Sequence, residues 1–264
     1  ISRAQIAADA SWSVIATPHF RVHFTPALDS LARHAAYEAE RAYANLASEL
    51  TRPRGKIDLV ISDAIDGSNG LATVFPRNRI VVYARPPADV NSLAGYDDWM
   101  RLVIQHELAH IFHLDRTRGI WRLGQYVLGR HPALFPNAYT PSWLKEGVAV
   151  YYESRFTEGG RLDDGYQYAL ARAAARRHTL PSLDALSLAR SEYPGGTAAY
   201  TYGSFLVNEL AERHGPASMR KLVEQGGGQL LPVYLNRMAS KSFGESFSRA
   251  WERWRDSVTA ATPA

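Results

Sequence analysis

The sequence predicts an α+β fold, with a mixed α/β N-terminal lobe followed by an all-helical C-terminal lobe. Short alternating or β-branched runs stop near residue 84, and from residue 97 onward the apolar residues recur at helical spacing. No linker separates the two halves. We therefore expect residues 1–264 to form one domain, with an α/β lobe over 1–96, a helical lobe over 97–264 and the active site in a cleft between them.

The N-terminal half contains the expected strands. Residues 19–24 (HFRVHF) alternate polar and apolar side chains, as in a half-buried strand. A helix is expected over 27–50, where leucines and alanines recur at helical spacing, and it ends at the Arg-Pro-Arg-Gly segment that follows. Further strands are expected at 56–62, 70–75 and 79–84.

The C-terminal half is expected to be helical. Asp97 or Asp98 is a suitable N-cap for a helix that runs to about Leu114. A long connection over 115–142 should contain one short helix, and Gly226-Gly227-Gly228 should act as a break. Further helices are expected at about 143–156, 164–177, 200–214, 216–225, 230–239 and 243–258.

Composition excludes several classes of protein. The 264-residue chain has no cysteine, which excludes disulfides, thiolate metal sites and cysteine nucleophiles. With 46% hydrophobic and 21% charged residues it is not a disordered chain, and no run approaches the length of a membrane span. For that reason we do not expect membrane insertion. The net charge of +4 comes from scattered arginines, so we do not expect nucleic-acid binding either.

The segment 101–115 contains the motif His106-Glu107-x-x-His110. On a helix, residues i and i+4 share a face, so both imidazoles can reach one metal ion. Glu107 is offset from His106 by about 100° and can address a metal-bound water instead. The rest of this helix is apolar, and burying two histidines and a glutamate is costly unless a partner satisfies them. Zinc would do so; hydrogen bonding within the core is the alternative.

A zinc site with an open position needs a third protein ligand. A third histidine six residues after His110 is excluded, because Arg116 stands there. The segment 141–154 (PSWLKEGVAVYYES) offers Glu146, a carboxylate on an otherwise apolar helix. The alternative for Glu146 is an exposed first-turn glutamate favoured by the helix dipole. Gly147 beside it should allow close approach of the zinc helix.

Together, H-E-x-x-H and the following W-L-x-E-G-x-A-x-Y resemble the gluzincin zinc metallopeptidases, and most closely the peptidase MA-like domains. The resemblance covers roughly residues 55–225 and implies a thermolysin-like (zincin) catalytic fold with one zinc ion per chain. It implies His106, His110 and Glu146 as zinc ligands. It also implies that Glu153, seven residues after Glu146, orients a ligand histidine.

The resemblance implies an oxyanion donor and a substrate strand as well. A tyrosine three residues before a glycine, at the start of a late helix, corresponds to Tyr200, and Tyr202 stays open as the alternative. The edge strand above the zinc would bind the substrate backbone through Asn69, Gly70, Leu71 and Ala72. Related aminopeptidases bind the substrate amino group with a glutamate beside this strand, whereas here residues 68–86 contain no acidic residue beside it.

Other polar and aromatic side chains have less specific interpretations. His113 lies one turn beyond His110, and we interpret it as a core histidine bonded to the backbone, with support of the zinc site as the alternative. The aromatic residues of the long connection should wall the cleft, with contact to a membrane surface as the alternative; they are Trp121, Tyr126, Phe135 and Tyr139.

The sequence thus predicts a zinc-dependent peptidase that acts on peptides or proteins, with Glu107 as general base and Tyr200 as oxyanion stabiliser. The alternative is a non-catalytic, peptidase-like zinc module that acts in assembly or binding. Glu107 argues against this alternative, because a structural zinc site needs no base and usually has four protein ligands. The absence of cysteine suits an exported bacterial protein, so we expect a periplasmic or secreted location.

Overall fold

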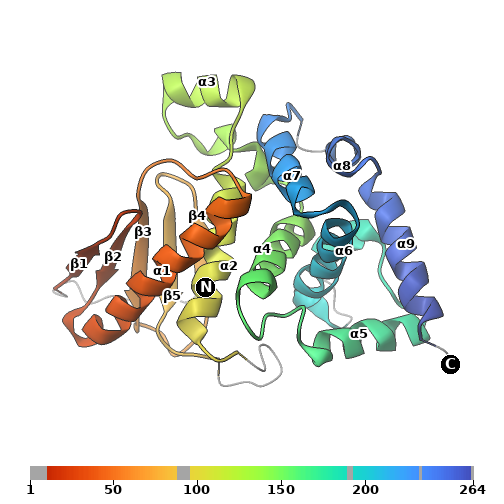
Figure 1. Cartoon of the computed structure of the whole chain (residues 1–264), viewed down its shortest axis with the longest axis horizontal. Helices are drawn as coiled ribbons and strands as arrows, with labels where there is room; N and C mark the ends of the chain where they lie inside the picture. The colour runs from red at the N-terminus through yellow and green to blue at the C-terminus, as the bar shows by residue number, and fades with distance from the viewer. Residues whose placement is uncertain (1–10, 88–95, 189–192, 232–233, 263–264) are drawn as a thin grey trace.

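The computed structural model describes residues 11–87, 96–188, 193–231 and 234–262. It confirms a mixed α/β chain in which a small sheet is followed by a mostly helical body (Figure 1). Five strands form one sheet in the order β1-β2-β3-β5-β4. Their bounds are β1 Ser13–Ala16, β2 Phe20–Phe24, β3 Ile57–Ser62, β4 Gly70–Thr73 and β5 Arg79–Tyr83.

The sheet is parallel at its centre and antiparallel at its edges. β2 pairs with β3 and β3 with β5 in parallel, while β1 and β4 are antiparallel edge strands. The expected strands all form, and β4 lies at the sheet edge where a substrate strand was predicted. β1 was not predicted, because a four-residue edge strand is too short to show a clear alternation.

Two long helices pack together beside the sheet. α1 (Asp29–Glu49) contacts β2 and α2 (Trp99–Leu114), and α2 contacts β4 and β5. The buried face of α1 consists mostly of alanines, which let the helix lie close to its neighbours. Asp98 is the N-cap of α2, since its side chain accepts a hydrogen bond from the Arg101 backbone N–H at 3.2 Å. This packing places the helix that carries the two candidate zinc histidines beside the edge strand.

The remaining helices form the larger part of the body, and none of those described is both long and apolar enough to cross a membrane. They are α3 Gly119–Leu128, α4 Ser142–Phe156, α5 Gly165–Arg176, α6 Ala198–His214, α7 Pro216–Gly228, α8 Leu235–Phe243 and α9 Phe247–Ala260. Short 3-10 helices lie at Pro26–Leu28, Pro132–Leu134, Pro136–Tyr139, Leu183–Ser187 and Gly195–Thr197.

The last two helices begin later than the sequence predicted. α8 ends at Phe243, and the next residue, Gly244, has a left-handed φ of 77° that favours glycine. Ser246 then caps α9 by accepting a hydrogen bond from the Arg249 backbone N–H at 3.2 Å. Residues 244–246 therefore separate the two helices, whereas the apolar spacing predicted that the second helix begins at residue 243.

The three glycines at 226–228 do not end the helix before them, contrary to the prediction. α7 continues to Gly228, and the glycines allow it to pack closely against the long connection. A Cβ on Gly226 would collide with the side chain of Asn137, and one on Gly227 would lie 2.6 Å from the Arg116 carbonyl oxygen. The triplet is therefore a packing feature of α7.

Glycines also bring α4 and α6 together. A Cβ on Gly147 would lie 2.5 Å from the Gly203 carbonyl oxygen, and one on Gly203 would collide with the Trp143 carbonyl oxygen. The expectation that Gly147 faces the zinc helix was wrong, because its open side faces α6. These contacts fix α4, which carries Glu146, against the helix that carries Tyr200.

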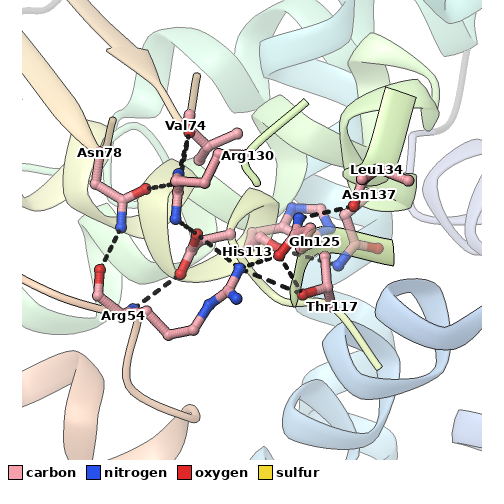
Figure 2. A network of polar contacts seen from close by, with 10 residues as sticks. Arg54, Val74, Asn78, His113, Thr117, Gln125, Arg130, Leu134 and Asn137 are labelled. Carbon is pink, nitrogen blue, oxygen red and sulfur yellow. Dashed lines mark hydrogen bonds and ion pairs between the residues drawn. The ribbon is translucent and has the colours of Figure 1, made fainter. Parts of the chain in front are cut away.

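A buried polar network joins the end of α2 to the end of β4 (Figure 2). Asp115, which ends α2, forms an ion pair with Arg130 at 2.8 Å and accepts the Arg54 backbone N–H at 2.9 Å. Arg130 in turn donates to the Val74 carbonyl oxygen at 3.1 Å and to the Asn78 side chain at 2.7 Å. The network therefore holds the turn after β4 in a defined position relative to α2.

Candidate active site

The two histidines of the H-E-x-x-H motif face one carboxylate oxygen. His106 and His110 lie on one side of α2, with ring centroids 4.9 Å apart. Their Nε2 atoms lie 3.4 and 3.2 Å from Oε2 of Glu146. Glu146 projects from the first turns of α4, which packs against α2. The three candidate zinc ligands thus converge as the sequence predicted, although Glu146 lies 36 residues after His110 in the chain.

This trio fits a divalent metal ion. Its three candidate ligand atoms all lie within 4.8 Å of one another. Oε2 of Glu146 is buried and has no hydrogen-bond partner among the described residues, although two imidazole nitrogens point towards it. Two imidazoles and one carboxylate are a donor set that zinc takes in catalytic sites, with one position left for water.

Without a metal, His106 and Glu146 have strongly shifted pKa values. Burial opposes the charged form of His106, but the carboxylates of Glu146 and Glu153 outweigh it and raise the pKa of His106 to about 9. Burial likewise favours the neutral form of Glu146, yet the two imidazoles that face it, those of His106 and His110, hold its pKa well below the usual range. A metal ion would take the place of the protons that these groups share.

Glu153 contacts the ring nitrogen of His106 that faces away from Glu146. Its carboxylate is fully buried, and Oε2 lies 2.8 Å from Nδ1 of His106. Because Nδ1 is engaged there, Nε2 is left to face Glu146. The pKa of Glu153 is lowered: burial opposes ionisation, but the charge of Arg161 and the hydrogen bond to His106 outweigh it.

Arg161 is a site residue that the sequence analysis missed. Its guanidinium donates to Oε2 of Glu153 at 2.6 Å, and its backbone N–H donates to Oε1 at 3.1 Å. Its Cζ also lies 5.2 Å from the centroid of the Tyr200 ring. Gly160 lets this loop return to α4, since a Cβ there would collide with Ser154. No periodic pattern marks a residue in such a loop, so the sequence held no signal for it.

The side chain of Glu107 extends from α2 towards the edge strand β4. The residue is 7% exposed, and its carboxylate faces Gly70 so closely that a Cβ there would lie 2.5 Å from Oε1. Both residues line a cavity of about 790 Å³, together with His106, Glu146 and residues of α5 and α6. Glu107 therefore points into the same space as the metal trio.

The candidate substrate strand presents backbone groups at the open edge of the sheet. The Asn69 carbonyl oxygen accepts the Tyr83 backbone N–H at 3.1 Å. Because inward and outward positions alternate in an antiparallel pair, Gly70 and Ala72 direct their N–H and C=O groups away from β5. The Gly70 N–H is already bonded to the Asn69 side chain at 2.9 Å. The Gly70 carbonyl and both groups of Ala72 remain for a partner strand, while the Leu71 side chain is exposed.

The two tyrosines of α6 have different surroundings. Tyr200 lines the cavity, with its ring 6.2 Å from that of His106. Burial and the nearby Glu146 carboxylate raise the pKa of Tyr200 to about 12, so its hydroxyl stays protonated at neutral pH. Tyr202 is buried in an aromatic cluster with Trp251 and Trp254. Of the two alternatives, Tyr200 is the one next to the metal trio.

His113 lies outside this cavity lining and is buried in the core. Burial lowers the pKa of His113 to about 3, so its ring is neutral. The expected bond between its ring and the backbone is not found at Nδ1, which has no partner among the described residues. It is the His113 carbonyl oxygen that is bonded, to the Asn137 side-chain amide at 2.9 Å.

The aromatic residues of the long connection do not wall the cavity, contrary to the prediction. Tyr126 is 88% exposed on α3, Tyr139 is exposed, and Phe135 is buried 5.0 Å beneath the Arg130 guanidinium. The Trp121 side chain is bonded to the Gln229 carbonyl oxygen at 2.8 Å. None of these four aromatic residues is among the described residues that line the cavity.

No protein-family model matches the sequence, and no curated protein matches it. Solved structures do match. Native yeast LTA4 hydrolase aligns over 92% of this chain and 38% of its own, with 15% identity and a TM-score of 0.54. The yeast enzyme in complex with bestatin aligns over 92% of this chain and 39% of its own, with 16% identity and a TM-score of 0.52. Legionella pneumophila aminopeptidase A in complex with aspartic acid aligns over 93% of this chain and 28% of its own, with 16% identity and a TM-score of 0.51.

The chain spans less than two-fifths of the length of these two proteins. At such low identity the likeness concerns the fold. The small five-stranded sheet and the mostly helical body of this chain thus resemble the matched region of these enzymes in fold.

Proposed function

We propose that the protein is a zinc-dependent peptidase of the gluzincin type, in which residues 1–264 form a single peptidase MA-like catalytic domain. The observation that carries this proposal is the convergence of His106, His110 and Glu146 on one buried point, with Glu107 directed into the same cavity. The resemblance of the fold to an aminopeptidase and to LTA4 hydrolase supports it.

One zinc ion per chain would be held by His106, His110 and Glu146. When bound, zinc supplies Lewis-acid polarisation of the scissile carbonyl and lowers the pKa of water. Glu153 keeps the His106 ring oriented, and Arg161 keeps Glu153 ionised. Each ligand is thus supported by the packing of α2 and α4 or by a buried hydrogen bond.

The chain's own residues then have distinct parts in peptide hydrolysis. Glu107 accepts the proton of the attacking water and passes it to the nitrogen of the leaving amine. The Tyr200 hydroxyl, protonated at neutral pH, donates a hydrogen bond to the oxyanion that develops on the scissile carbonyl. The outward groups of Gly70 and Ala72 pair with an extended substrate, as an added strand does at a sheet edge.

The charges of the cavity favour cleavage within a chain over removal of N-terminal residues. The acidic side chains among its described lining residues are Glu107, Glu146 and Glu153, and all three serve the metal centre or the proton transfer. Lys145 and Arg161 line the same space. No carboxylate among these lining residues is then left to pair with a substrate ammonium group, so we expect N-acetylated peptides to be cleaved at least as well as free ones.

The test combines metal analysis with proteolysis of an unfolded protein. We expect about one zinc ion per chain, reduced in His106→Gln and His110→Gln but not in His131→Gln, which replaces an exposed histidine of the long connection. Glu107→Gln should keep zinc and lose activity by orders of magnitude. A zinc-loaded wild type that cleaves no unfolded protein would favour the non-catalytic module, and an active Glu107→Gln variant would remove Glu107 as the base.

A further inference from the structure

Helix α3 exposes the apolar side chains that a helix of a soluble protein normally buries. It stands off the rest of the molecule at the top of the view (Figure 1). Five large side chains of this ten-residue helix are between 60% and 88% exposed: Ile120, Leu123, Tyr126, Val127 and Leu128. Ile120, Leu123 and Val127 are spaced i, i+3 and i+7, so they form one continuous apolar ridge.

The opposite side of α3 is held to the body by polar contacts. Gln125 is the buried residue of this helix, and its side-chain amide donates to the Leu134 carbonyl oxygen at 2.8 Å. Its carbonyl oxygen accepts hydrogen bonds from Thr117 and Arg54. Trp121, one turn earlier, is bonded to the Gln229 carbonyl oxygen. This anchoring fixes the helix with its polar residue inward and its apolar ridge outward, which is the reverse of a surface helix that faces water on its outer side.

The charges around the ridge are basic. No acidic residue occurs in the sequence from 116 to 145. Arg122 on α3 and Arg118 beside it are exposed; Arg118 is also paired with Glu224 at 3.3 Å, so Arg122 carries more of the free positive charge. The turn after β4 adds exposed Phe75 and Arg77, and it lies next to this segment because Arg130 donates to the Val74 carbonyl oxygen. An apolar ridge with a basic surround matches a surface that is apolar within and anionic outside.

We propose that α3 and the turn after β4 dock the protein on an anionic lipid surface. Interfacial helices lie in the plane of the membrane with the apolar face about 5–10 Å deep, and basic residues gain from anionic headgroups. A projecting, convex ridge can enter such a surface without a complementary groove. The exposed aromatic rings of Phe75 and Tyr126 fit the headgroup level, where aromatic side chains are enriched.

The test is co-sedimentation of the whole chain with vesicles of equal parts phosphatidylcholine and phosphatidylglycerol. We expect the wild type to bind these vesicles, to bind phosphatidylcholine vesicles more weakly, and to lose binding as salt is raised. The double variant Leu123→Asp/Val127→Asp should bind the anionic vesicles at least about tenfold more weakly, since two apolar side chains no longer enter the lipid. Tyr37→Asp is the matched control, because Tyr37 is 64% exposed on α1, as is Leu123 on α3.

Each outcome decides the proposal. Peptide hydrolysis in solution should be equal in the wild type and the α3 variant, which shows that the variant is folded. Absence of vesicle binding by the wild type, equal binding by the α3 variant, or equal binding to neutral vesicles would overturn it. Sedimentation velocity tests whether the ridge binds a second copy of this chain instead of lipid. That would be the conclusion if the wild type is a dimer that does not bind vesicles and Leu123→Asp/Val127→Asp is a monomer.

Discussion

Replacing Gly70 by alanine tests whether β4 lies where the proposed chemistry needs it. The added Cβ would lie 2.5 Å from Oε1 and 2.6 Å from Cγ of Glu107. Since carbon and oxygen atoms in contact stay roughly 3.5 Å apart, the strand or the carboxylate must move by about 1 Å. A misplacement of about 1 Å can cost about a hundredfold in rate, so kcat/KM for a peptide should fall by about that factor, or about 2.7 kcal/mol.

The metal content separates this effect from a general loss of structure. Zinc should stay at the wild-type level in Gly70→Ala, because the nearest atoms to the new methyl group belong to Glu107 and to none of the proposed ligands. Gly67→Ala is the control, since its Cβ would lie at an ordinary 3.5 Å from the Ile65 side chain. If Gly70→Ala is folded, zinc-loaded and as active as the wild type, the geometry assigned to β4 and Glu107 is refuted.

Three further predictions concern α6 and the core. Tyr200→Phe should lower kcat by about 10²–10³ with little change in KM, whereas Tyr202→Phe should have a small effect on rate; the reverse order in steady-state kinetics would move the oxyanion role to Tyr202. Gly203→Ala should destabilise the protein by about 1–3 kcal/mol, because its Cβ collides with the Trp143 carbonyl oxygen of α4. It should also weaken zinc binding in a chelator competition, since α4 carries a ligand; unchanged affinity would show that α4 does not move. Burial lowers the pKa of His113 from 6.5 to about 3, so the unfolded chain takes up a proton that the folded chain refuses. The contribution of His113 to the free energy of unfolding is therefore fully present above about pH 6.5 and falls by up to about 1.4 kcal/mol per pH unit as the pH drops towards 3. The free energy of unfolding can be measured by urea unfolding at several pH values in the presence of chelator. It should change less steeply with pH in His113→Gln than in the wild type, and an equal dependence on pH would mean that His113 is not the titrating group.

Local spacing in the sequence was sufficient for the centre of the candidate site. The i, i+4 histidines of α2 share a face whatever surrounds the helix, so their convergence followed from helical geometry alone. Glu146 and Glu153 stand seven residues apart on α4, which returns both to the face that meets α2. The edge position of β4, in contrast, was implied by the resemblance to gluzincins and not by spacing.

Contacts between elements far apart in the chain were decided only by the tertiary structure. Arg161 reaches Glu153 because the loop after α4 folds back over Gly160, and no periodicity marks that return. Gly147 carries no information about which helix it meets, and the structure shows that it meets α6.

The outward ridge of α3 has the same origin. Its apolar spacing predicts an amphipathic helix, but periodicity does not say which side faces the core. The hydrogen bonds of Gln125 to segments on either side of α3 decide that the polar side is buried. Sequence spacing determines the faces of each element, whereas the choice of which faces meet depends on packing and hydrogen bonds between residues distant in the chain, and these exist only once the chain is folded.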